Sequence, residues 1–286
     1  MTIIIHGATG AQGGPLIKRL LASGKPALAA VRNASSANGL PSVVVDNASV
    51  DSLVAAYRGA EGVFFHLPLA SEEDRVQYAH NFAQAIALAR PARVVISTSG
   101  NVIDEPGSPT QVPNDSAVAV LVREVARTGV SFAVVAPRLY LENLLLPTQF
   151  GAVQAEGVLR YPLRTDYPVS WSSHHDVAAV AERLLADTAI KGIVGLGHAP
   201  GLTGADLAEG FAQHLGKPVH YEAITPEAFG DMIAPLFGAG PAAGVVAGYQ
   251  AKAQTNGCVI ANATSAQSLL GLKPRSVQQW LADVLG

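Results

Sequence analysis

HGATGAQGG, residues 6–14, follows the β-forming run TIII at residues 2–5 and precedes a helical pattern. Its first three glycines recur every three residues. Glycine lets a backbone turn sharply, approach a pyrophosphate without a Cβ in the way, and start a helix whose free N–H groups face the anion. The spacing is GxxGxxG rather than GxGxxG, so the prediction of a dinucleotide site depends mainly on the strand–turn–helix context. The residues expected to hold a dinucleotide here are Gly7, Thr9, Gly10, Ala11, Gln12 and Gly13.

Strand and helix patterns alternate through the first half of the chain. The strand-forming runs are apolar throughout, which indicates burial on both faces of a parallel sheet. Strands are expected at 2–6, 27–32, 42–46, 62–67, 92–98 and 131–137, and helices at 13–23, 49–58, 72–89 and 115–128. This alternation predicts the α/β class and a doubly wound parallel sheet, the Rossmann plan.

After about residue 140 the patterns become shorter and less regular. Strands are expected at 158–163, 192–197 and 219–224, and helices at 174–187, 203–215, 226–236 and 276–285. We therefore predict a dinucleotide-binding Rossmann domain over residues 1–150 and a smaller α/β substrate lobe over residues 151–286, with a cleft between them. The boundary is approximate, because the chain can return to the sheet.

The composition narrows the class of protein. Of the 286 residues 49% are hydrophobic and 14% are charged, against about 25% charged in an average protein. This predicts a deep core and is compatible with a homodimer. A net charge of -3 without a basic stripe argues against a nucleic-acid partner. The single cysteine, Cys258, excludes an internal disulfide and fits a reducing, cytoplasmic compartment, but its role stays open. No signal peptide is expected, because the first strand begins at Thr2.

Two other stretches invite a functional reading. The uncharged run 232–251 is long enough for a membrane span, but its two prolines and four glycines favour soluble helices. Its glycines at 240, 244 and 248 would share one helix face and pack closely against a neighbour.

The stretch SHHD, residues 173–176, predicts the start of a helix, because Ser173 and Asp176 resemble a helix capping box. Because neighbouring helical histidines point about 100° apart, no metal site is expected there.

The end of the second strand selects the cofactor. An acidic residue there binds the ribose 2′-hydroxyl of NAD, whereas a cation binds the 2′-phosphate of NADP. Arg32 and Asn33 stand there, so the sequence predicts NADP(H). Asp46 and Asn47, after the third strand, would touch the adenine edge or only form a turn. The nicotinamide half would lie against residues that follow the fourth and fifth strands: His66, Leu67, Pro68, Ser97 and Thr98.

The chain resembles the NmrA-like group of atypical short-chain dehydrogenases/reductases. The resemblance rests on GATGAQGG (7–14), VRN (31–33), GVFFHLP (62–68), VISTSG (95–100) and GVSFAVVAPRLYLENLL (129–145), and extends through HDVAAVAERLL (175–185) and residues 201–229. That group includes NADPH-dependent quinone oxidoreductases, triphenylmethane dye reductases and redox-sensing regulators. The resemblance implies a Rossmann domain, NADPH and a small substrate lobe.

The proton relay of typical short-chain dehydrogenases is missing. Those enzymes carry a Tyr-x-x-x-Lys pair on the helix after the fifth strand, where by resemblance Asn114 and Val118 stand. This departure argues against alcohol dehydrogenase and epimerase chemistry. Hydride transfer to a quinone or an electron-poor dye needs mainly alignment on the nicotinamide.

We therefore expect a reductase of a small quinone-like acceptor. The alternative is a non-catalytic NADP(H) sensor that binds a partner protein, which explains the missing relay equally well. The candidates for an acceptor pocket are Tyr140, Asn143 and Trp171, although the two aromatic rings could instead belong to the core.

Overall fold

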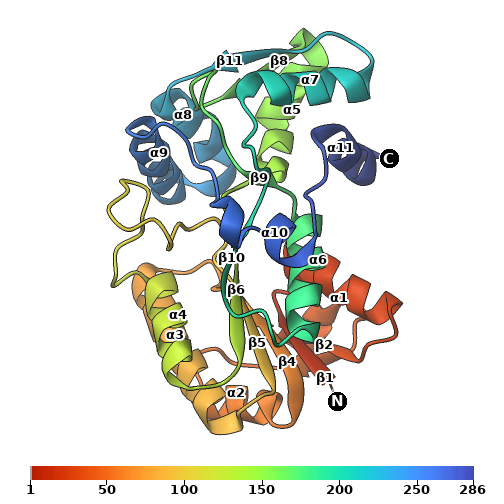
Figure 1. Cartoon of the computed structure of the whole chain (residues 1–286), viewed down its shortest axis with the longest axis vertical. Helices are drawn as coiled ribbons and strands as arrows, with labels where there is room; N and C mark the ends of the chain where they lie inside the picture. The colour runs from red at the N-terminus through yellow and green to blue at the C-terminus, as the bar shows by residue number, and fades with distance from the viewer. Residues whose placement is uncertain (1) are drawn as a thin grey trace.

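A parallel sheet forms the lower layer of the computed structural model, which describes residues 2–286 (Figure 1). Within these residues seven strands lie in the order β10-β6-β5-β4-β1-β2-β3, and all neighbouring pairs are parallel. Their bounds are β1 Thr2–His6, β2 Ala27–Val31, β3 Ser42–Val44, β4 Ala60–Phe65, β5 Arg93–Ser97, β6 Phe132–Pro137 and β10 Gly192–Leu196. The chain fills one side of β1 first and then crosses to β4, so the strand order reverses between β1 and β4.

Helices cover both faces of this sheet. On one face, α1 (Gly13–Ala22) packs against α6 (His174–Ala186). On the other face lie α2 (Val50–Tyr57), α3 (Glu72–Ala89) and α4 (Ala117–Arg127) (Figure 1). Each face has its own buried apolar cluster. The predicted doubly wound α/β plan is confirmed.

The second layer is a lobe beyond the carboxyl ends of the strands (Figure 1). It has two small parallel ribbons, β11 with β8 and β7 with β9. Its elements are β7 Leu139–Tyr140, the 3₁₀ helix η2 Leu141–Leu145, α5 Pro147–Glu156, β8 Val158–Tyr161, β9 Trp171–Ser172, α7 Gly204–Leu215, β11 His220–Ala223, α8 Pro226–Phe237, α9 Ala239–Ala253 and α11 Val277–Leu285. Three shorter helices complete the chain: η1 Ala34–Ala37, η3 Asn262–Thr264 and α10 Ala266–Leu270.

The chain does return to the sheet after residue 150. The lobe core surrounds Trp171, Phe211 and Trp280, but α6 and β10 belong to the lower layer. The two layers are therefore interleaved along the sequence rather than divided at one residue.

The start of α6 carries the predicted capping box. Ser173 accepts a hydrogen bond from the N–H of Asp176, and Asp176 accepts one from the N–H of Ser173. Within residues 2–286 no cluster of three possible metal ligands is found.

The uncharged run 232–251 forms parts of two helices, α8 and α9, separated at Gly238 with φ +91°. No helix of residues 2–286 combines the length and the apolarity that crossing a bilayer requires. The expected close packing of the α9 glycines is wrong: a Cβ built on Gly240, Gly244 or Gly248 would meet nothing within 4 Å. The close contact between these helices is made by Gly230 instead, where a Cβ would lie 2.4 Å from Val246.

Candidate cofactor and acceptor site

The glycine turn brings α1 directly against β1. Gly7 has φ +62°, and a Cβ built on it would lie 2.3 Å from Nε2 of His66. A Cβ on Gly13 would lie 2.5 Å from the carbonyl oxygens of both His6 and Gly7. Gly10 donates its N–H to the Gly7 carbonyl at 2.9 Å and closes the turn. Because glycine has no side chain, the helix can begin this close to the strand.

The first turn of α1 is suited to an anion. No side chain caps it, and it contains no acidic residue. The positive end of the helix dipole is therefore not neutralised by a side chain of the first turn, which favours a bound anion.

A cavity of about 720 Å³ runs along the carboxyl ends of β1 to β4. Of the predicted cofactor residues it is lined by Gly7, Thr9, Arg32, Asp46, Asn47, His66 and Pro68. It is also lined by residues that the sequence patterns did not single out: His6, Ala30, Val31, Ser36, Val45, Leu69, Ala70 and Tyr78. The other predicted residues do not line it: Gly10, Ala11, Gln12, Gly13, Asn33, Leu67, Ser97 and Thr98.

Arg32 is the cation of this cavity. It is exposed at the end of β2 and forms no ion pair with any carboxylate of residues 2–286. Asp46 forms a turn, since its Oδ1 accepts the N–H of Ala48 at 2.9 Å. The Asn47 carbonyl accepts a hydrogen bond from Asn81 at 3.0 Å. The guanidinium is thus free to bind a phosphate, while Asp46 and Asn47 shape the adjacent wall.

Four buried polar atoms at this edge have no hydrogen-bond partner within residues 2–286. They follow the strands β3, β4, β5 and β6, of which the last three are neighbours in the sheet, and are Asn47 Oδ1, His66 Nε2, Thr98 Oγ1 and the Tyr140 hydroxyl. Buried polar groups are nearly always paired, and each exception calls for an explanation. Together with the glycine cradle, these atoms fit a polar ligand that lies along the strand ends, such as a dinucleotide.

The two histidines of the cavity are neutral. Burial, together with a smaller effect of the neighbouring His66, lowers the pKa of His6 to about 3. Burial also lowers the pKa of His66, whose Nδ1 lies 3.4 Å from the Leu67 carbonyl. His6 is held by the Tyr57 hydroxyl at 2.7 Å and by the edges of aromatic rings. The positive charge in the site therefore comes from Arg32 and the helix end.

Gln12 points away from the cavity wall. Its Nε2 donates to Ser99 Oγ at 2.9 Å, and its Oε1 accepts from Ser97 Oγ at 2.6 Å. Sequence reasoning expected a polar group beside the phosphates at this position, and the amide is instead satisfied by the end of β5. Thr98 is 1% exposed, and its carbonyl accepts from Asn101.

The three acceptor-pocket candidates occupy different environments. Tyr140 packs against the ring of His174 with centroids 4.5 Å apart, and burial raises the pKa of its hydroxyl, which lies near Ser97. Asn143 donates to the Tyr161 hydroxyl at 3.4 Å. Trp171 is 1% exposed and packs edge-on against Tyr161 in the lobe core. Tyr140 therefore lies at the sheet edge, whereas Trp171 is a core residue.

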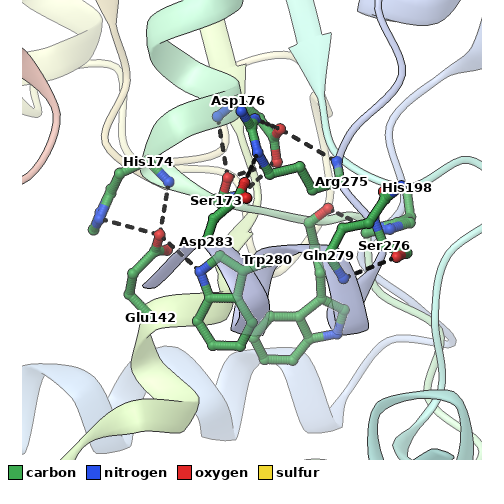
Figure 2. A network of polar contacts seen from close by, with 11 residues as sticks. Glu142, Ser173, His174, Asp176, His198, Arg275, Ser276, Gln279, Trp280 and Asp283 are labelled. Carbon is green, nitrogen blue, oxygen red and sulfur yellow. Dashed lines mark hydrogen bonds and ion pairs between the residues drawn. The ribbon is translucent and has the colours of Figure 1, made fainter. Parts of the chain in front are cut away.

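A polar network joins η2, α6 and α11 (Figure 2). Oε1 of Glu142 accepts the N–H of His174 at 3.0 Å and Nε1 of Trp280 at 3.2 Å, so it joins η2, α6 and α11. Asp176 pairs with Arg275 at 2.7 Å. Burial raises the pKa of Glu142 and lowers that of His174 to about 4. No local sequence pattern predicts this network, because its members are far apart in the chain.

The positions that would carry the proton relay have other roles. Asn114 is exposed before α4, and its carbonyl accepts from Arg123 at 2.8 Å. Val118 is 3% exposed in the core between the sheet and α4.

Comparison with known proteins assigns the class. Residues 1–281 match the NmrA-like family, and the chain belongs to this family. It is 30% identical over 231 residues to the NAD(P)H azoreductase of Xenophilus azovorans, which covers 79% of this chain and 78% of that protein.

Solved structures share the whole architecture. The NADPH-dependent quinone oxidoreductase QOR2 of Escherichia coli, complexed with NADPH, is 19% identical with a TM-score of 0.76 and covers 100% of both chains. The triphenylmethane reductase of Citrobacter sp., complexed with NADP(H), is 18% identical with a TM-score of 0.76 and covers 98% of both chains. At these identities the similarity establishes the common fold.

Proposed function

We propose that this protein is an NADPH-dependent oxidoreductase that transfers hydride to a quinone-like or other electron-poor acceptor without a Tyr-Lys proton relay. The observation that carries the proposal is Arg32, an exposed guanidinium without an ion-pair partner in residues 2–286, on the same cavity as Gly7 and Thr9 of the glycine turn that leads into the uncapped α1. A guanidinium and a glycine turn that leads into a helix suit the 2′-phosphate and pyrophosphate of NADP(H).

Each part of the edge then has a role toward the dinucleotide, which supplies the hydride when bound. The glycine turn and Thr9 hold the pyrophosphate, and Arg32 with Asn33 holds the 2′-phosphate. Asp46 and Asn47 border the adenine. His66, Leu67, Pro68 and the ends of β5 and β6 border the nicotinamide half. Tyr140 and Asn143 border the acceptor.

The names of the relatives support this choice of acceptor. Azo compounds, quinones and triphenylmethane dyes are the acceptors named for the proteins similar to this chain, and all three are conjugated and electron-poor. A relay-free site is suited to such acceptors, because alignment supplies most of the catalysis.

The first test is cofactor choice in the purified protein. Arg32→Ala should weaken NADPH binding about 10- to 100-fold, since a hydrogen bond to a charged group contributes roughly 1.5–3 kcal/mol. NADH binding should change less than about threefold, because NADH has no 2′-phosphate. Arg58→Ala, an exposed arginine beyond the end of α2, is the matched control. Equal losses for both dinucleotides would refute the role of Arg32.

The second test is turnover. NADPH oxidation should be measured with several quinones, an azo dye and a triphenylmethane dye. Turnover of at least one acceptor above background supports the reductase. NADPH binding without turnover of any acceptor would refute it and favour the redox sensor.

A further inference from the structure

The side chain of Gln12 spans the point where the strand order reverses. It leaves the turn after β1 and ends on Ser97 and Ser99 at the end of β5, while β4 lies between these two strands. Ser97 Oγ also accepts the N–H of Ser99 at 3.2 Å. Gln12 is 7% exposed, Ser97 is 2% exposed and Ser99 is half-buried. These three residues, which we call the Gln12 bridge, form a hydrogen-bonded unit that is buried at Gln12 and Ser97.

Ser99 has an unusual backbone conformation. Its φ of +54° lies in the left-handed region. The other two non-glycine residues with positive φ in residues 2–286 are Asn38 and Arg90, and both follow a helix, where this conformation is ordinary. Ser99 follows a strand. A strained residue that its surroundings hold in place is often part of a functional site.

The hydrogen bonds of the bridge leave one proton free. A serine hydroxyl has one hydrogen to donate and two lone pairs. Ser97 donates its hydrogen to Gln12, and Ser99 accepts from Gln12. The hydroxyl hydrogen of Ser99 has no acceptor among residues 2–286, and Ser99 is only half-buried. The Gln12 bridge therefore holds the oxygen of Ser99 and leaves its hydrogen for a ligand at the strand ends.

We propose that Ser99 donates this hydrogen bond to the acceptor atom on which negative charge develops during reduction, and that Gln12 is the positioning residue for it. The inference rests on the proposed function. A quinone that accepts a hydride carries the resulting negative charge on an oxygen until that oxygen takes one proton from water. The dinucleotide is oxidised by the same two electrons. Ser99 keeps its own proton and stabilises the oxyanion, as a preorganised donor does.

Acceptors of different charge separate the proposed hydrogen-bonding role of Ser99 from a purely structural role. A cationic triphenylmethane dye or N-methylacridinium takes hydride on carbon and becomes neutral, so no oxyanion forms. Reduction of a neutral quinone should therefore depend on Ser99, and reduction of a cation should not.

The key variant is Ser99→Gly, which removes the hydroxyl and suits the positive φ. Its kcat/KM for a quinone should fall about 100-fold, the loss that removal of one such donor causes. Its kcat/KM for the cation and its NADPH dissociation constant should change less than about threefold. Asn38→Gly, at another positive φ, controls for the backbone change. Equal losses for quinone and cation, or no loss for quinone, would overturn the proposal.

Gln12→Leu tests the positioning role. It should lower quinone turnover as Ser99→Gly does, and the double variant should lose little more, because both changes remove one unit. A second readout is the urea midpoint of the cofactor-free protein, where the two substitutions should shift the midpoint non-additively. Additive effects in both measurements would refute the claim that Gln12 positions Ser99. If wild type binds NADPH but reduces nothing, the proposed function fails, whereas the unfolding cycle still reports on the bridge.

Discussion

Replacing Gly13 by alanine tests how closely α1 must approach β1. The added Cβ would lie 2.5 Å from two carbonyl oxygens, and α1 would have to withdraw by about half an ångström to reach even 3.0 Å. That movement disturbs Leu16, Ile17 and Leu20, all of which are fully buried. Overpacking of this kind costs about 1–3 kcal/mol of unfolding free energy. Because the phosphate cradle moves with the helix, NADPH binding should weaken at least about tenfold.

Gly14→Ala is the matched control on the next residue. Its Cβ would lie 3.4 Å from the Ala8 carbonyl, an ordinary contact. Alanine is favoured over glycine within a helix by about 0.5–1 kcal/mol, so this variant should be slightly stabilised. Urea denaturation followed by circular dichroism gives the stability, and fluorescence titration gives NADPH affinity. If both variants unfolded at the same urea concentration and bound NADPH equally, the argument from close approach would be wrong.

Two further predictions concern stability. As pH falls below 6.5, His6 takes up a proton in the unfolded protein. In the folded protein it stays neutral, because its pKa there is about 3. Stability should therefore fall with pH, and His6 should account for about 2 kcal/mol of the loss between pH 7 and 5. The double variant His6→Phe/Tyr57→Phe, measured by urea denaturation at both pH values, should lose less; an unchanged difference would contradict this assignment. Arg93, which is 1% exposed, donates to the carbonyls of Leu184, Asp187 and Ile190, at the end of α6 and in the loop that follows it. Arg93→Met should cost about 3 kcal/mol, whereas the exposed Arg90→Met should cost less than about 0.5. Equal urea midpoints for Arg93→Met and Arg90→Met would show that the hydrogen bonds from Arg93 to these carbonyls do not stabilise the fold.

The lower layer could be predicted from the sequence because its signals are local. Each strand is a continuous apolar run, and the glycine turn is complete within residues 7–14. Helix α3 has the predicted bounds 72–89, since Ser71 caps its start. The lobe was harder: α5 was not predicted, because its apolar residues do not recur at a helical period.

Side-chain partners at the site were beyond local reasoning. The polar character of Gln12 was apparent, but its partner Ser97 lies 85 positions away. Trp171 could belong to a pocket or a core, and the choice is made by lobe residues that surround it, such as Tyr161. The α9 glycines share spacing with closely packed helices, but spacing does not say which way a helix face points.

The place of α6 and β10 has a consequence for synthesis. The apolar cluster around Leu16 and Val135 is completed by Leu184 and Val194. A nascent chain that ends at residue 150 contains the whole glycine turn and six of the sheet strands, but the sheet face that α1 and α6 share is covered only by α1. The lobe segment 139–173 emerges before α6 does. The dinucleotide layer therefore cannot mature ahead of the lobe, and a fragment cut at residue 150 should aggregate rather than bind NADPH.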